Sequence, residues 1–306
     1  MSVENVLKLS NITKYYGNKK AVDNASMTIQ KGDVYGLIGR NGAGKTTLIR
    51  IITALSTTYE GQVELFGKTN IEDLAKARSR MGAVIESPAF YPNLSATQNL
   101  EYYQKLKGIV DKEVINNTLV KVGLDHASNK KFKNFSMGMK QRLGIALTLI
   151  NSPDFIILDE PINGLDPKGV IEFREMIKKL NEEQNMTILI SSHLLSELSL
   201  VATRYGVIEE GKMVKEFSSE ELAKECQLSL SIIVDDVKAA TVILETVLKT
   251  TNFKVASNNE IRLYDYLDNG SEVNFQLMSN GVRVQSITQI GDSLEDYFMS
   301  LIKEGK

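Results

Sequence analysis

Alternation of apolar and polar positions predicts strands with one buried face in the first part of the chain. Leu7 and Leu9 share one face of a first strand, and Met27 and Ile29 share one face of a second strand that follows a turn. Residues 62–66 alternate again. We therefore expect three half-buried strands within the first seventy or so residues.

Uninterrupted apolar runs predict strands of a second kind, which are buried on both faces in a parallel sheet. These runs cover residues 34–38, 81–85, 155–158 and 187–191. Helical segments are predicted at residues 46–52 and 140–150, and another helix opens at Asp166, with Pro167 in its first turn. The alternation of strands and helices predicts an α/β fold.

A helical insertion interrupts this order. Ser95 and Gln98 form a capping box that starts a helix to about Lys107, and a second helix runs from Asp111 to near Gly123. A projecting insertion suits docking on another protein, and a plain crossover connection is the alternative.

The character of the sequence changes after about Ser218. The segments from there on read as strand, helix, strand, strand, helix, strand and a final helix, at residues 228–234, 237–248, 253–256, 261–265, 273–278, 282–287 and 294–302. This order predicts a small ferredoxin-like α/β domain in which no chemical motif is evident. We expect a first domain at 1–217, with a helical subdomain at about 87–135, and an accessory domain at 218–306.

Composition limits the classes of protein and partner that fit this chain. With 306 residues, the chain is long enough for two domains, and a net charge of −2 provides no basic excess to hold a nucleic-acid backbone. The single cysteine, Cys226, excludes an internal disulfide. No apolar run approaches a membrane span, and Met1-Ser2-Val3-Glu4 does not resemble a signal peptide. We expect a cytoplasmic protein that reaches a membrane only through a partner.

The first candidate for chemistry is Gly39-Arg40-Asn41-Gly42-Ala43-Gly44-Lys45-Thr46-Thr47, which matches the phosphate-binding loop pattern between a strand and a helix. Its glycines let backbone N–H groups face an anion, and the following helix points its positive end at the same place. Lys45 would reach the β- and γ-phosphates, and the Thr46 hydroxyl would bind magnesium. An accidental glycine-rich turn is the alternative.

Polar groups follow several of the buried strands, and such strand ends meet at the ligand-binding edge of a parallel sheet. Asp159 is placed to hold magnesium and Glu160 to accept a proton from an attacking water, although two acids there could also be helix caps. Glu86 and His193 end two other strands. His126 lies in a polar loop, which we interpret as surface.

A second anion site is predicted where Phe135-Ser136-Met137-Gly138-Met139 leads into an apolar helix, because Ser136 is a natural N-cap. Tyr16, in Tyr15-Tyr16-Gly17, could stack on a purine or simply pack.

In order and spacing, residues 1 to about 215 resemble the nucleotide-binding subunit of an ABC transporter. The matching motifs are the adenine-stacking aromatic residue at Tyr16, the phosphate loop, the signature at Ser136 to Gly138, the Asp159-Glu160 strand end, the aspartate loop at Asp166 and the switch histidine at His193. The resemblance implies a P-loop cassette with a mixed sheet core, an antiparallel β subdomain and a helical subdomain.

Two positions depart from that family pattern. Glu86 stands where the family usually has glutamine, and the signature carries Met137 and Met139. Together with the residues that follow it as far as Pro92, Glu86 resembles the bacitracin-resistance and lantibiotic-immunity branch. The end of the chain, Ser293-Leu294-Glu295-Asp296-Tyr297-Phe298, resembles the same branch and nearby drug exporters.

The resemblance implies ATP hydrolysis with Mg²⁺ in a head-to-tail pair of cassettes docked on a membrane-spanning partner, with no nucleic acid bound. Glu160 would activate water, His193 would hold the γ-phosphate and the water, and Lys45 would bind phosphate. The implied nucleotide contacts are Tyr16, Gly39, Asn41, Gly42, Gly44, Lys45, Thr46, Thr47, Ser136, Gly138 and Asp166, and the implied metal contacts are Thr46, Glu86 and Asp159. The cargo would be an antimicrobial peptide or a drug, exported by a transporter on the inner face of the cell membrane.

Two other classes compete with this interpretation. A soluble ABC protein of ribosomes or DNA would typically carry two cassettes or long coiled coils, which this sequence lacks. A P-loop kinase would need an acceptor site and leaves the turn at Ser136 unexplained.

Overall fold

The computed structural model describes residues 4–86, 89–111, 113–226, 228–291 and 294–304. The chain divides into two compact units, of which the first comprises Met1–Ser219 with Leu301–Lys306 and the second Glu220–Ser300. Ser87 and Pro88, where the helical insertion was predicted to begin, lie outside the described residues, as does Ser293.

The alternating segments of the first unit form an antiparallel sheet of three strands in the order β2-β1-β4. Its strands are β1 (Asn5–Tyr16), β2 (Lys19–Gln30) and β4 (Glu60–Leu65). Leu7, Leu9, Met27 and Ile29 are all buried, so the face predicted from alternation is the one that packs on the core.

The apolar runs form four adjacent strands, with β5 at the edge, of a six-stranded sheet in the order β5-β6-β7-β3-β8-β9. The strands are β3 (Val34–Ile38), β5 (Met81–Val84), β6 (Phe155–Asp159), β7 (Thr187–Ser192), β8 (Arg204–Glu209) and β9 (Lys212–Ser218). The first five strands in this order are parallel and β9 is antiparallel. Every residue of β3, β6 and β7 is buried, as unbroken apolar runs predict.

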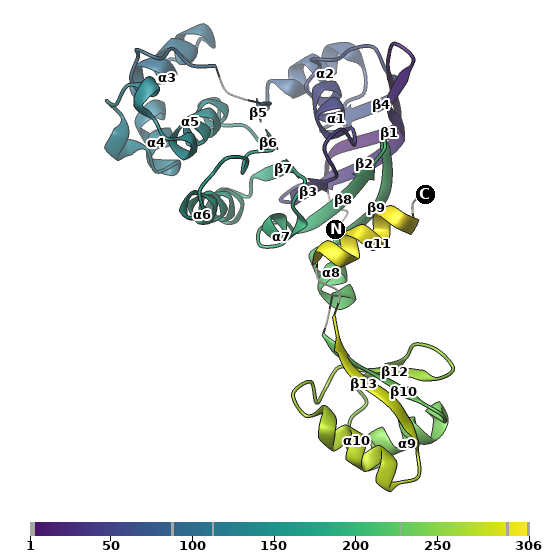
Figure 1. The fold of residues 1–306 in the computed structure, drawn as a ribbon. Coiled ribbons are helices and arrows are strands. Elements are labelled where there is room, and N and C mark those ends of the chain that lie inside the picture. The colour runs from purple at the N-terminus through teal and green to yellow at the C-terminus, as the bar shows by residue number, and fades with distance from the viewer. Residues whose placement is uncertain (1–3, 87–88, 112, 227, 292–293, 305–306) are drawn as a thin grey trace. The chain divides into compact units, whose positions relative to one another are not determined.

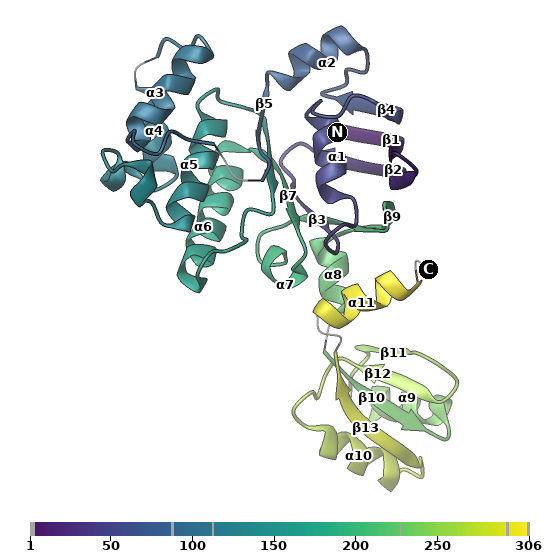
Figure 2. The ribbon, with the colours of Figure 1, turned by 45° about the horizontal axis from the view of Figure 1, so that its top comes forward.

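Helix α1 (Lys45–Ile52) lies between the two sheets (Figures 1 and 2). Its buried face, Leu48, Ile49, Ile51 and Ile52, belongs to one hydrophobic cluster with residues of both sheets. The helix that follows the phosphate loop is therefore fixed by packing on two sides.

The remaining helices of the first unit are α2 (Ile71–Arg78), α3 (Ala96–Leu106), α4 (Val114–Lys121), α5 (Met137–Leu149), α6 (Pro167–Gln184) and α7 (Leu195–Leu198). Helix α8 (Ser219–Glu225) begins where the chain passes into the second unit. Short 3₁₀ turns cover Asp125–Ala127 and Phe132–Asn134. The capping box is confirmed, because Ser95 accepts from the Gln98 N–H and the Gln98 side chain accepts from the Ser95 N–H.

Two helix starts differ from the sequence prediction. The helix predicted to begin at Lys140 begins at Met137, because the Ser136 hydroxyl accepts a hydrogen bond from the Met139 N–H and draws the preceding turn into the helix. The helix predicted from Asp111 begins at Val114. The short α2, capped by Asn70, and the β8–β9 hairpin were not predicted.

The second unit is a four-stranded antiparallel sheet in the order β11-β12-β10-β13. Its elements are β10 (Ser229–Val234), α9 (Val237–Thr246), β11 (Phe253–Val255), β12 (Glu260–Leu263), α10 (Gly270–Ser279) and β13 (Val284–Ile290). This is the ferredoxin-like arrangement predicted from the element order. The last helix, α11 (Leu294–Glu304), follows β13. Across the part of the chain that the structure describes, no helix has the length and apolar character to span a membrane.

Candidate functional site

The loop between β3 and α1 curls around the ammonium group of Lys45. Its Nζ donates to the carbonyl oxygens of Gly39, at 2.6 Å, and Arg40, at 3.2 Å, and the side chain is only 5% exposed. Gly44 has a φ of 115°, a conformation that favours glycine, and a Cβ on Gly39 would lie 2.4 Å from the carbonyl oxygen of Ile208. The loop thus requires glycines at these two places, as the motif predicts.

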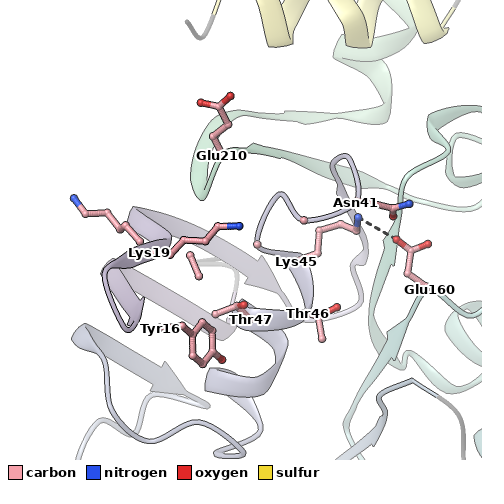
Figure 3. A pocket seen from close by; sticks show the side chains of 12 residues that line it. Tyr16, Lys19, Asn41, Lys45, Thr46, Thr47, Glu160 and Glu210 are labelled. Carbon is pink, nitrogen blue, oxygen red and sulfur yellow. Dashed lines mark ion pairs between the residues drawn. The ribbon is translucent and has the colours of Figure 1, made fainter.

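A cavity of about 490 Å³ opens beside this loop (Figure 3). Its lining includes the predicted nucleotide contacts Tyr16, Asn41, Gly42, Gly44, Lys45, Thr46 and Thr47, together with Glu160. The Tyr16 ring is about half exposed, and the Lys14 ammonium lies 5.1 Å from its centroid. The structure therefore brings the predicted aromatic residue, the loop and the predicted carboxylate of Glu160 to the same cavity.

Thr46 and Asp159 meet at the edge of this cavity. The Thr46 hydroxyl lies 2.8 Å from Asp159 Oδ2, and the buried Ser191 hydroxyl lies 2.5 Å from Asp159 Oδ1. Asp159 is the last residue of β6 and lies opposite Ser191 in the neighbouring parallel strand β7, so the pairing of the two strands fixes the position of this carboxylate. Hydroxyl and carboxylate oxygens are the ligands that Mg²⁺ prefers.

Glu160 carries the second carboxylate, between two basic side chains. One oxygen lies 3.0 Å from Lys45 Nζ and the other 3.0 Å from His193 Nδ1. Burial alone would raise the pKa of Glu160, but the hydrogen bonds from His193 and Lys45 outweigh it and lower the pKa below its ordinary value. The Glu160 backbone has a φ of 49° and its N–H donates to the Ser191 hydroxyl. An ionised acid is thus aimed at the loop lysine.

Glu86, the third predicted metal contact, pairs with an arginine of α1. Its side chain is about two-thirds exposed and its carboxylate pairs with Arg50 Nη2 at 2.5 Å. Within the described residues, Glu86 makes no hydrogen bond to Thr46 or Asp159. The structure therefore brings together two of the three predicted metal contacts, and Glu86 is bound elsewhere.

A second cavity, of about 570 Å³, gathers the other predicted residues. It is lined by Ser136, Gly138 and Asp166, with His126, Met137, Met139, Arg142, Gly164, Lys168, Gly169 and Glu172. Ser136 caps α5, and Asp166 caps α6 through a 2.8 Å hydrogen bond from the Gly169 N–H. Two helix N-termini thus face one hollow, which favours an anion there.

Sequence reasoning missed several residues of these cavities. Lys19, Lys20, Ala21 and Glu210 line the first cavity and Arg142 and Lys168 line the second, where exposed His126 also lies. Glu210 sits on the β8–β9 turn, which is tied to the phosphate loop because the Gly211 N–H donates to the Ala43 carbonyl at 2.8 Å. No local motif marks Glu210, since only the sheet order brings this hairpin to the loop.

The fold and the site define a P-loop ATPase, with a phosphate loop, an acid-ended strand and a histidine at one sheet edge. The chain belongs to the family of ABC transporter ATP-binding proteins. The family model described as ABC transporter matches residues 22–163. The bacitracin transport ATP-binding protein BcrA of Bacillus licheniformis is 41% identical over 300 residues, which cover 98% of each chain.

Other relatives agree with this family. The lantibiotic transport ATP-binding protein SrtF of Streptococcus pyogenes is 44% identical over 223 residues, which cover 72% of this chain and 95% of SrtF. Among solved structures, cbiO1 from Clostridium perfringens, part of the ABC transporter complex cbiONQ, matches with a TM-score of 0.66 and 26% identity over 72% of this chain and 92% of cbiO1. The dimeric ATP-binding cassette MJ0796, bound to ADP and Pi, matches with a TM-score of 0.62 and 28% identity over 70% of this chain and 98% of MJ0796.

The chain is therefore an ATP-binding, ATP-hydrolysing subunit of an ABC transporter, and the predicted family, fold class and activity are confirmed. The relatives support the transport-linked ATPase over the soluble ribosome- or DNA-associated alternative.

Proposed function

We propose that this subunit energises the export of a peptide antibiotic through a separate membrane-spanning permease, from the inner face of the cell membrane. The observation that carries the proposal is the similarity to BcrA over almost the whole of both chains, which includes the second unit as well as the cassette. The shorter match to SrtF supports the same substrate class. A second cassette, identical or paralogous, completes the assembly.

For hydrolysis we propose that Glu160 is the general base. Its carboxylate is ionised at neutral pH, lies at the end of β6, and has Lys45 on one oxygen and His193 on the other. Lys45 turns to the β- and γ-phosphates when ATP fills the first cavity, which leaves Glu160 with His193 and a water to activate. Tyr16 supports the adenine, while Gly39, Asn41, Gly42, Gly44 and Thr47 form the phosphate cradle.

Thr46 and Asp159 would hold a magnesium ion, since their oxygens already lie within 2.8 Å of one another and Mg²⁺ needs few protein ligands beside phosphate and water. When bound, the ion neutralises charge that develops on the phosphate oxygens. The hydrogen bond from Ser191 would keep the Asp159 carboxylate in place, and the Thr46 hydroxyl would be the second protein group that holds the ion.

We further propose that the second cavity receives the γ-phosphate of ATP held by a partner cassette. Ser136 and Gly138, at the start of α5, would meet that phosphate, and Asp166 would couple the two sites of the pair. Met137 and Met139 flank these contacts, and Met137 is about half exposed, so it would lie in the contact surface. Neither site is complete in a single chain under this proposal.

The first test is analytical ultracentrifugation of the purified Glu160→Gln protein with and without ATP, because blocked hydrolysis traps any closed pair. We expect a dimer that depends on ATP. A variant that binds ATP but stays monomeric would contradict self-pairing and would call for a paralogous cassette. The substrate is tested separately, by expressing the chain with its permease in a bacitracin-sensitive cell and using Glu160→Gln as the matched inactive control. Equal sensitivity of both strains would contradict bacitracin export.

A further inference from the structure

Two side chains of helix α1 bind carboxylates that lie at the ends of two neighbouring strands. Thr46 bonds Asp159 at the end of β6, and Arg50 pairs with Glu86 just after β5, at 2.8 Å and 2.5 Å. Thr46 and Arg50 are four residues apart, so they project from the same side of the helix. Because β5 and β6 pair in parallel, with Val84 opposite Leu158, their trailing acids reach the helix one turn apart.

Three carboxylates thus stand at the ends of two neighbouring strands, and each has its own donors. Of the three, Glu160 lines the cavity that must accept a polyphosphate. Asp159 has Thr46 and Ser191, Glu160 has Lys45 and His193, and Glu86 has Arg50. The nucleotide and its magnesium take over Thr46 and Lys45 under the proposed function. Arg50 is the donor that the nucleotide does not need, so it can keep its acid throughout.

Glu86 also has an unusual backbone. Its φ is 61°, a left-handed conformation that a glutamate rarely adopts and that persists where surrounding contacts hold it. The guanidinium group of arginine is always charged and forms directed bonds to carboxylates. The ion pair with Arg50 therefore fixes the position of the Glu86 carboxylate and neutralises its charge.

We propose that Arg50 is a positioning residue which neutralises Glu86 and holds it away from the phosphates, and that this pairing allows an acid to stand where the family usually has glutamine. The inference rests on the proposed nucleotide site. Without Arg50, the Glu86 carboxylate adds an unpaired negative charge at the end of the strand next to the one that carries Asp159 and Glu160, on the side of the sheet to which anionic ATP is proposed to bind. The expected consequence is weaker binding of Mg·ATP with little change in the chemical step.

A double-mutant cycle tests this, with KM for Mg·ATP and kcat measured at low salt for the wild type, Arg50→Ala, Glu86→Gln and the double variant. Arg50→Ala is expected to raise KM about two- to fivefold, the size that exposed charges usually produce, and to change kcat less. In the Glu86→Gln background, the same change is expected to leave KM where Glu86→Gln alone put it. Raising the salt to about 0.5 M should remove most of the Arg50→Ala effect, because exposed charges are screened.

Arg80 provides a matched control. It pairs with Asp154 at 2.7 Å, is about as exposed as Arg50, and links the opposite ends of the same two strands. Arg80→Ala should leave KM unchanged, and thermal melting should show that both arginine variants are folded.

The proposal is overturned if Arg50→Ala leaves KM unchanged, or if it raises KM equally in the Glu86→Gln background. The second outcome would mean that Arg50 supports the C-terminal end of α1 in a way independent of Glu86. A wild-type protein that fails to hydrolyse ATP at all would instead contradict the proposed function.

Discussion

Lys45 and Glu160 form an ion pair across the first cavity, with the ammonium nitrogen 3.0 Å from the carboxylate oxygen. The same ammonium group is bonded to the carbonyl oxygens of Gly39 and Arg40. All of its hydrogen-bonding capacity is therefore used before ATP binds. Binding of the phosphates must exchange these contacts, so the lysine and the acid are linked in both affinity and chemistry.

Replacing Lys45 with alanine should weaken ATP binding by about 10- to 150-fold, because a charge-assisted hydrogen bond contributes about 1.5–3 kcal/mol. Isothermal titration with a non-hydrolysable ATP analogue measures the loss. Lys45→Arg is the matched variant. Because the Lys45 side chain is only 5% exposed, a planar guanidinium group does not fit in its place. If Lys45→Ala binds the ATP analogue with an affinity close to that of the wild type, Lys45 does not bind the phosphates.

Glu160→Gln keeps the shape of the side chain and removes its charge. Turnover should fall by about 10²–10⁴-fold, as expected for loss of a general base, while ATP affinity stays within a few fold of the wild type. Phosphate release measures the first quantity and equilibrium binding the second. Near-normal turnover would mean that another group activates the water.

The pH dependence follows from the lowered pKa of Glu160. The ionised carboxylate is the active form, so kcat/KM should stay level as the pH falls towards neutrality and decline only as the pH passes through that lowered pKa. The decline therefore lies below the ordinary pKa of a glutamate, about 4.3. His193→Ala removes one of the hydrogen bonds that lower the pKa, and the acid limb should move to higher pH. A limb that keeps its position in His193→Ala would show that this hydrogen bond does not set the pKa.

The capping contact of Asp166 can be separated experimentally from the coupling role proposed for it. As the N-cap of α6 it accepts from the Gly169 N–H, so Asp166→Ala should reduce the free energy of unfolding by about 1 kcal/mol, whereas Asp166→Asn can still cap the helix. Denaturant unfolding checks this difference. If Asp166 also couples the two sites, Asp166→Asn should lower ATPase activity without lowering stability. Full activity in Asp166→Asn would leave capping as its role.

Much of the cassette could be predicted from the sequence because its elements are locally coded. Residues 34–38 and 155–158 are apolar runs, which predict strands buried on both faces of the sheet. Ser95 and Gln98 form a capping box, which marks the start of a helix in the sequence itself. The βαββαβ order of the second unit could also be predicted from the sequence, and its strand order, β11-β12-β10-β13, is the ferredoxin-like one.

What could not be predicted depends on contacts between distant segments. Glu86 follows β5 closely, much as Asp159 ends β6, yet Glu86 pairs with Arg50 of α1, and no local pattern tells which acid lies at the phosphate loop. The position of Glu210 at the first cavity depends on the hydrogen bond from Gly211 to Ala43. The strand β8 was missed for a different reason: residues 205–208 are fully buried, and the apolar criterion used elsewhere would have found them.

The second unit is inserted into the sequence of the first. The chain leaves the cassette at Ser219 and rejoins it at Leu301, which is buried, as is Ile302. Within the ferredoxin-like unit, Ser229 near the entry pairs directly with Ile290 near the exit. Because its first and last strands pair, the second unit is inserted into the cassette sequence as a loop would be, and the boundary at Leu301 falls within α11, so this one helix belongs to both units.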